Sequence, residues 1–101
     1  MSYSVEPWPG DSAPPRDEVE AIFSREGLAP RAWSNGPGDR YSSHTHSYYK
    51  VLYCMEGTIT FNVQDEEVEL AAGDRLEIPP GTSHSATVGP HGVTCIEAAR
   101  Y

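Results

Sequence analysis

From Arg31 onward, the chain is a succession of short segments of β type. These segments are rich in β-branched and aromatic residues, and glycine or proline separates most of them. After a first segment that begins at Arg31, they cover residues 46–56, 58–64, 66–70, 74–79, 84–88 and 93–99. Short strands at such close spacing predict an all-β sandwich or barrel. Because 101 residues can bury only one core, the chain has room for one barrel around one small pocket.

Three glycine- or proline-containing segments are predicted to interrupt the strands. Glu56-Gly57 and Ala72-Gly73-Asp74 have the composition of turns. Pro79-Pro80-Gly81 predicts a tight bend, which would direct His84 toward the inside of the barrel.

Residues 1–16 are predicted to form an extended arm ahead of the barrel, which we place at residues 31–101. Each proline of the arm removes a backbone donor and disfavours helix in the residue before it. These prolines are Pro7, Pro9, Pro14 and Pro15.

Between the arm and the barrel, residues 17–30 predict one short helix and a connection. The helix is expected over residues 17–26, because apolar residues recur at helical spacing, acids occupy the first turn and Gly27 follows as a stop signal. The apolar stripe consists of Val19, Ile22 and Phe23. We interpret it as a lid on the barrel or as a contact between two copies of the chain.

Three histidines give the sequence its potential for metal binding. His44 and His46 are one residue apart, so on a strand they point to the same face if Thr45 points away. A third imidazole, from His84 on another strand, would complete a facial metal site.

The residues around these histidines are spaced in a specific way. Residues 38–57 read G-DRYSS-H-T-H-SYY-K-VLYCME-G, and residues 73–84 read G-DRLEI-P-P-G-TS-H. The two segments resemble the two cupin motifs, G-x5-H-x-H-x3-E-x6-G and G-x5-P-x-G-x2-H, in order and in spacing. The resemblance covers residues 31–98 and is to the small single-domain cupins. It implies a double-stranded β-helix, or jelly-roll, barrel, here with a short N-terminal helix.

Two positions depart from the cupin pattern. The acidic ligand of the family falls on Lys50, and the Asn that often ends the second motif falls on Val88. An ammonium among three imidazoles repels a divalent cation and is costly to bury, so Lys50 should be paired, partly neutralised or turned away.

Strand alternation suggests a partner for Lys50. If the alternation starts at Lys50, then Leu52 and Cys54 face inward with it, whereas Val51 and Tyr53 face the other side. In the last strand Val93, Cys95 and Glu97 share one face, so Glu97 enters the barrel if Val93 packs inside. Glu97 would then neutralise Lys50 or replace the missing acidic ligand. In the opposite case it points to solvent or caps the strand end.

Three roles for Lys50 remain open at this point: a structural ion pair, a group that orients an anionic substrate beside the metal, and a catalytic amine of lowered pKa. Tyr48 is a further pocket candidate, because its hydroxyl can reach into the barrel. Cys54 and Cys95 are also candidates by their inward face, although we interpret them as small buried hydrophobes.

Charge and composition exclude several classes of partner. The net charge of −8 and the pI near 4.8 repel nucleic acids and anionic membranes, and the few basic residues are scattered. No apolar run is long enough to span a bilayer, and the first ten residues lack the features of a signal peptide, so we expect a cytoplasmic protein. Two cysteines make no disulfide framework.

An outer sheet face that carries Val51 and Tyr53 is expected to need a partner, so we predict a homodimer.

The resemblance implies a cupin that binds a divalent transition metal, Fe, Mn, Ni, Zn or Cu, through His44, His46 and His84. Imidazole suits all five metals, so the sequence does not choose among them. For an enzyme, the resemblance implies metal-dependent oxygenase or isomerase chemistry on a small organic ligand. The alternative is a non-catalytic module that binds or senses a small molecule and holds no ion. Fold alone does not decide between the two.

Overall fold

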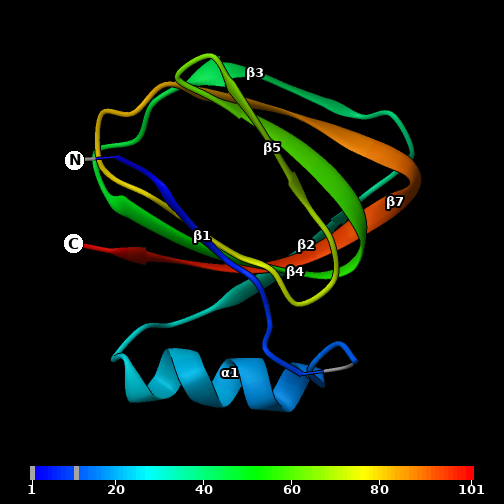
Figure 1. The fold of residues 1–101 in the computed structure, drawn as a ribbon. Coiled ribbons are helices and arrows are strands. Elements are labelled where there is room, and N and C mark those ends of the chain that lie inside the picture. The colour runs from blue at the N-terminus through cyan, green and yellow to red at the C-terminus, as the bar shows by residue number, and fades with distance from the viewer. Residues whose placement is uncertain (1, 11) are drawn as a thin grey trace.

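The computed structural model describes residues 2–10 and 12–101 as seven strands and one helix (Figure 1). Along the chain the elements are β1 (Ser4–Glu6), α1 (Arg16–Arg25), β2 (Arg31–Asn35), β3 (Arg40–His44), β4 (Tyr49–Val63), β5 (Glu66–Leu70), β6 (Arg75–Ile78) and β7 (His84–Arg100). Met1 and Asp11, which belong to the predicted arm, lie outside the described residues.

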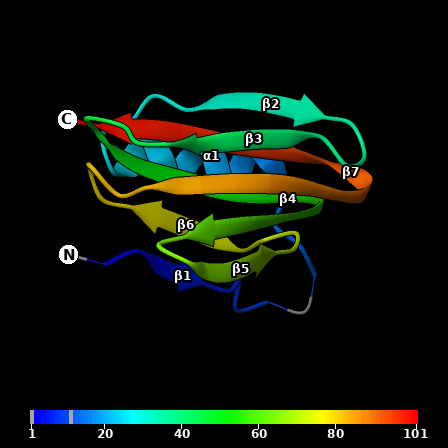
Figure 2. The same ribbon diagram turned by 90° about the horizontal axis from the view of Figure 1, so that it is seen from above.

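Two long strands, β4 and β7, organise the barrel (Figures 1 and 2). They pair antiparallel with each other from Tyr49↔Arg100 to Val63↔His84. The first part of β4 also pairs with β6 and its last part with β5, while β2 and β3 pair with the two ends of β7. The result is one seven-stranded sheet, in which β1-β6-β4-β7-β2 form one wall of the barrel, and β5 and β3 extend β4 and β7 into the opposite wall (Figure 1). The predicted all-β jelly-roll barrel is confirmed.

β4 and β7 bend together at Gly57 and Gly92, whose φ angles are +73° and +81°. A Cβ atom on Gly57 would lie 1.9 Å from the carbonyl oxygen of Gly92, so only glycine fits. The register of the pair shifts on both sides of Gly57. The turn predicted at Glu56-Gly57 is therefore wrong, because here the glycine permits bulges within a continuous strand. The turn predicted at residues 72–74 is confirmed.

Side chains alternate along β4 between two separate cores. Leu52 and Cys54 point into the barrel, where they join the main apolar cluster. Val51 and Tyr53 belong to a second cluster on the opposite side of the sheet. The alternation predicted from Lys50 is confirmed for these four residues.

α1 covers that second cluster. Val19 and Phe23 are fully buried against the outward-facing residues of β4 and β7, and Figure 1 shows the helix beneath this sheet. Val51 and Tyr53 are 0% and 5% exposed, so the prediction that they lie on an open outer face is wrong. An open apolar face therefore no longer supports the predicted homodimer. The homodimer stays a prediction, which light scattering would test.

The helix begins at Arg16 and ends at Arg25, one residue earlier at each end than predicted. Its first turn starts at Arg16 because the carbonyl oxygen of Pro15 already accepts two helical N–H groups, at 3.1 and 3.3 Å. Gly27, with φ +75°, lets the chain leave the helix.

The N-terminal arm contributes to the sheet through β1, which adds to the edge of β6 with Val5 opposite Leu76. The arm is thus extended, as predicted, over the residues that pair.

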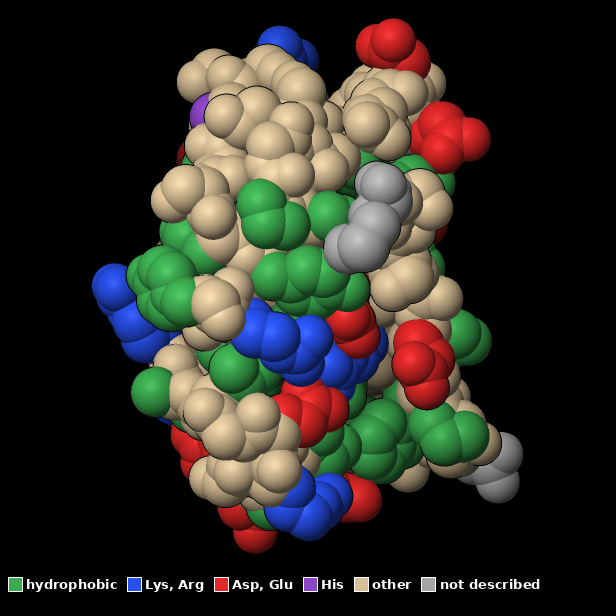
Figure 3. All heavy atoms as spheres, turned by 90° about the vertical axis from the view of Figure 1, so that its left-hand side faces the viewer, with side chains coloured by type: hydrophobic (Ala, Val, Ile, Leu, Met, Phe, Trp, Pro, Cys, Tyr) green, Lys and Arg blue, Asp and Glu red, His purple; other side chains and the backbone are tan. Residues whose placement is uncertain are grey.

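No helix among the described residues has the length and apolar character that crossing a bilayer requires. At the left-hand end of the barrel in Figure 1, basic and acidic side chains lie next to one another at mid-height (Figure 3).

Candidate metal centre and ligand cavity

The three histidines meet at one end of the barrel. His44 ends β3 and faces its pairing partner His84, the first residue of β7, while His46 follows two residues after β3. One nitrogen from each ring can be chosen so that all three lie within 4.8 Å of one another. The ring centroids are 4.4 to 5.2 Å apart. The structure therefore brings together the three ligands predicted from the sequence.

A turn at residues 79–82 ties the segments that carry His46 and His84. The N–H of Gly81 donates to the carbonyl oxygen of His46 at 2.9 Å, and the N–H of Thr82 donates to that of Pro79 at 3.4 Å. His84 follows this turn with 2% of its surface exposed. The predicted bend thus fixes two of the three imidazoles relative to each other.

Hydrogen bonds orient two of the rings. Nδ1 of His44 lies 2.7 Å from the carbonyl oxygen of Ser42, and Nδ1 of His84 lies 2.9 Å from that of Thr82. A carbonyl can only accept, so Nδ1 carries the proton in each ring and a neutral ring keeps its lone pair on Nε2. This is the tautomer that a metal ligand needs.

The buried nitrogens at the centre have no hydrogen-bond partner among the described residues. These atoms are Nε2 of His46 and Nε2 of His84, although buried polar atoms normally make a hydrogen bond. Burial lowers the pKa of His46, and the Lys50 ammonium and His44 lower it further. Burial, His44 and Lys50 likewise lower the pKa of His84, against the bond to Thr82. Neutral imidazoles with free lone pairs fit a transition metal.

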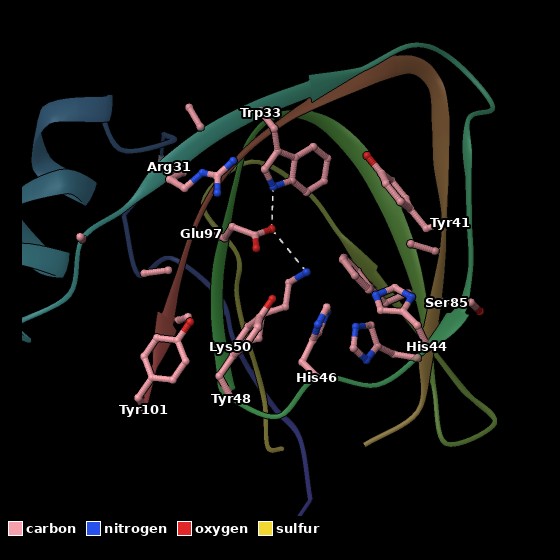
Figure 4. A pocket seen from close by; sticks show the side chains of 17 residues that line it. Arg31, Trp33, Tyr41, His44, His46, Tyr48, Lys50, Ser85, Glu97 and Tyr101 are labelled. Atoms are coloured by element: carbon pink, nitrogen blue, oxygen red, sulfur yellow. Dashed lines mark hydrogen bonds and ion pairs between the residues drawn. The ribbon is translucent and has the colours of Figure 1, made fainter. Parts of the chain in front are cut away.

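Lys50 and Glu97 meet inside the barrel. Nζ of Lys50 lies 3.3 Å from Oε1 of Glu97, which also accepts a hydrogen bond from Nε1 of Trp33 at 2.6 Å (Figure 4). Both residues of the ion pair therefore face inward, as the strand alternation predicts. The same alternation did not reveal Trp33, because its partner strand and register are not visible in the sequence.

The histidines and the ion pair line a cavity of about 710 Å³, a size that suits one small organic molecule. Tyr48 stacks on His46, with ring centroids 4.6 Å apart, and lies at the wall. Burial, Glu97 and Tyr101 raise the pKa of Tyr48, so its hydroxyl stays protonated at neutral pH. Much of the remaining wall is aromatic or small, and it includes Trp33, Tyr41, Phe61, Ala86 and Ala98.

The two cysteines lie outside this lining. Cys54 and Cys95 face each other across β4 and β7 and are fully buried in the main apolar core. Contact with the Cys54 thiol and burial raise the pKa of Cys95, so it has no thiolate to offer a metal. Both cysteines therefore pack as small buried hydrophobic residues.

A family profile described as Cupin domain matches residues 33–94. Quercetin 2,3-dioxygenase of Bacillus subtilis is 33% identical over 97 residues, which make up 90% of this chain and 29% of the enzyme. The chain thus spans less than a third of that relative's length.

Solved structures give the same fold. An RmlC-like cupin from Shewanella frigidimarina is 29% identical, with a TM-score of 0.65 over 71% of this chain and 64% of the other. A cupin superfamily protein from Desulfitobacterium hafniense has a TM-score of 0.65 over 96% of this chain and 75% of its own. At 11% identity, this second likeness concerns the fold alone.

Proposed function

The chain belongs to the cupin domain family, and on that premise we propose that it holds one divalent first-row transition metal and presents it to a small organic ligand. The metal ligands are His44, His46 and His84. The ligand occupies the cavity that these residues share with Lys50 and Glu97.

One observation carries the proposal. Two imidazole nitrogens, Nε2 of His46 and Nε2 of His84, are buried beside a third histidine with no partner in the described part of the chain. Leaving such atoms unpaired costs about 1–3 kcal/mol each. A shared metal ion satisfies both nitrogens, and the Nδ1 bonds of His44 and His84 hold the rings in the tautomer it requires.

Such a metal supplies Lewis-acid polarisation of a substrate oxygen and, where it is redox-active, one-electron chemistry. The protein's own side chains do the rest. Trp33, Tyr41 and Phe61 exclude water and pack against the apolar part of a ligand. Tyr48 keeps its proton at neutral pH and is a hydrogen-bond donor at the wall.

The likeness to quercetin 2,3-dioxygenase favours an oxygenase reaction over an isomerase reaction. It does not select the metal, because imidazole accepts Fe, Mn, Ni, Zn and Cu alike. The substrate of that enzyme need not be the substrate here, since this chain corresponds to 29% of it.

A second candidate is a metal-free module that binds or senses a small molecule. The Lys50–Glu97 pair favours it, because Lys50 stands where related motifs have an acidic ligand and its charge repels a cation. The buried, unpartnered nitrogens argue against it.

Metal analysis of tag-free protein separates the two candidates. After incubation with each divalent metal in turn and removal of excess, we expect one equivalent of at least one metal in the wild type. His46→Ala should lower the affinity by at least about 100-fold, since loss of even a supporting group costs 10- to 100-fold. His91→Ala is the matched control, because His91 is exposed, lies beside the bend at Gly92 and is not part of the cavity lining. Full metal content in His46→Ala would refute the site, and a metal-free wild type would favour the binding module.

A further inference from the structure

The wall of the cavity carries more positive than negative charge. Its charged side chains are Arg31, Lys50 and Glu97, so they sum to one positive charge. This local excess of positive charge, in a protein of net charge −8, favours a negative ligand over a positive one.

The position of Lys50 is fixed by the fold. The backbone of Lys50 pairs with Ile78 on one side and Ala99 on the other, in the middle of the sheet. About 10% of its side chain is exposed, and the Nζ atom lies 6.0 Å from the centre of the Phe61 ring. The ammonium is therefore a preorganised donor, which loses little freedom when a ligand binds.

Glu97 leaves part of this ammonium free. Its Oε1 atom is shared between Lys50 and Trp33, whereas an ammonium has three N–H groups to donate. Figure 4 shows the tip of Lys50 between Glu97 on one side and His44 and His46 on the other. The donors that Glu97 does not use thus lie on the side of the cavity that holds the imidazoles.

A metal at the histidines would enlarge the excess of positive charge. Three neutral imidazoles leave the two charges of a divalent ion uncompensated. The nearby Lys50 ammonium then repels the ion, unless an anion lies close to both. A carboxylate in place of Lys50 would itself offset the positive charge of the ion. With a lysine at this position, the negative charge has to come from the ligand.

We propose that Lys50 is a specificity-determining residue that binds the oxyanion of the ligand, and that the ligand is a small planar organic acid or enol. Its carboxylate, phenolate or enolate oxygen lies between Nζ of Lys50 and the three histidines. Its apolar body packs against Trp33 and Phe61. This inference rests on the proposed function for the metal, but the contact with Lys50 does not require the metal.

The test uses 2-naphthoate and its uncharged counterpart 2-naphthamide, which have nearly the same shape. Calorimetry with metal-free and metal-loaded protein gives the affinity of each. We expect the wild type to bind naphthoate at least about tenfold more tightly than naphthamide, as for a hydrogen bond to a charged group. Lys50→Met should lower the affinity for naphthoate about 10- to 100-fold and change that for naphthamide less than about twofold. The control Arg40→Met removes an exposed charge outside the cavity and should leave both affinities unchanged.

A second measurement needs no variant. Lys50 is the only lysine in the sequence, so ¹³Cε-labelled lysine gives one side-chain signal from the wild-type protein. Saturation with naphthoate should shift that signal, whereas naphthamide should not.

The outcomes separate this inference from the proposed function. Selective naphthoate binding that depends on Lys50 in protein unable to hold a metal would refute the metal centre alone. Equal affinity for the two probes, an unshifted Lys50 signal at saturation, or no binding of either probe up to millimolar concentration would overturn the inference. A full metal site with any of these results would leave the proposed function standing.

Discussion

Arg75 and Lys50 are the two buried cations among the described residues, and about 10% of each side chain is exposed. They lie on opposite faces of one sheet. Arg75 lies on the side covered by α1, and its Nε donates to Glu77 while Nη1 and Nη2 donate to Glu26. Nη1 also contacts the hydroxyl of Tyr53. Burial acts to lower the pKa of Arg75, but these bonds outweigh it and raise the pKa.

Lys50 has far fewer hydrogen-bond acceptors around it than Arg75 has. It has one carboxylate, Glu97, and shares it with Trp33. On its other side are two imidazole nitrogens with no hydrogen-bond partner within residues 2–10 and 12–101. The comparison teaches that burial alone does not identify a functional charge. A cation whose donors are all used fastens two elements together, whereas a cation with unused donors beside other unpaired atoms is available to a ligand.

The largest expected effect is a loss of stability at Arg75, on the side of the sheet that α1 covers. Arg75→Met leaves Glu26 and Glu77 without their main partner, and we expect the free energy of unfolding to fall by about 3 kcal/mol. Urea unfolding measures this change. Arg16→Met, which removes an exposed pair with Glu20, is the control and should cost less than about 0.5 kcal/mol. If both variants lost equally little, the Arg75 cluster would not fasten α1 to the sheet.

A smaller loss of stability is expected on the cavity side. Lys50→Met deprives Glu97 of one partner but leaves the Trp33 bond and some solvent contact, so we expect a loss of about 1–2 kcal/mol. Metal affinity should instead rise, on the order of tenfold, because a like charge is removed from beside the ion. Metal titration of the variant and of Arg40→Met checks this. A fall in metal affinity specific to Lys50→Met would show that the ammonium supports the centre.

The smallest effect is a difference in acid sensitivity. Burial acts to raise the pKa of Glu77, but hydrogen bonds from Tyr49 and Arg75 outweigh it and lower that pKa below its usual 4.5. The stability that Glu77 contributes is complete above pH 4.5 and is lost as the pH falls through the lowered native value. Arg75→Met removes one cause of the lowering. We therefore expect the unfolding free energies of wild type and variant to converge at acidic pH, as measured by urea unfolding at several pH values; parallel curves would contradict this.

The sequence predicted the cavity side better than the helix side. His44, His46, Lys50 and Glu97 follow from motif spacing and strand alternation, which are local properties. The bonds of Arg75 to Glu26 join residues far apart in the chain, so no local pattern reveals them.

The cover of α1 over Val51 was missed for a related reason. An apolar strand face looks the same in sequence whether a helix, a second copy or solvent lies over it. Gly57 was misread as a turn because glycine serves turns and bulges equally. What distinguishes them is the close approach of Gly92, which is a tertiary contact.

The pairing of β4 with β7 also sets an order for folding. Its residue pairs run from Val63↔His84, whose members are nearest to each other in sequence, to Tyr49↔Arg100, whose members are farthest apart in sequence. Closing the shorter loop costs less entropy, so the pair should close from the Val63 end toward the Tyr49 end. Pulse-labelled hydrogen exchange should protect the amide of Phe61 before that of Leu52, and simultaneous protection would contradict this order. Lys50, which pairs with Ala99, should therefore be placed late, and the pocket should gain its charge selectivity only in the last stage of closure.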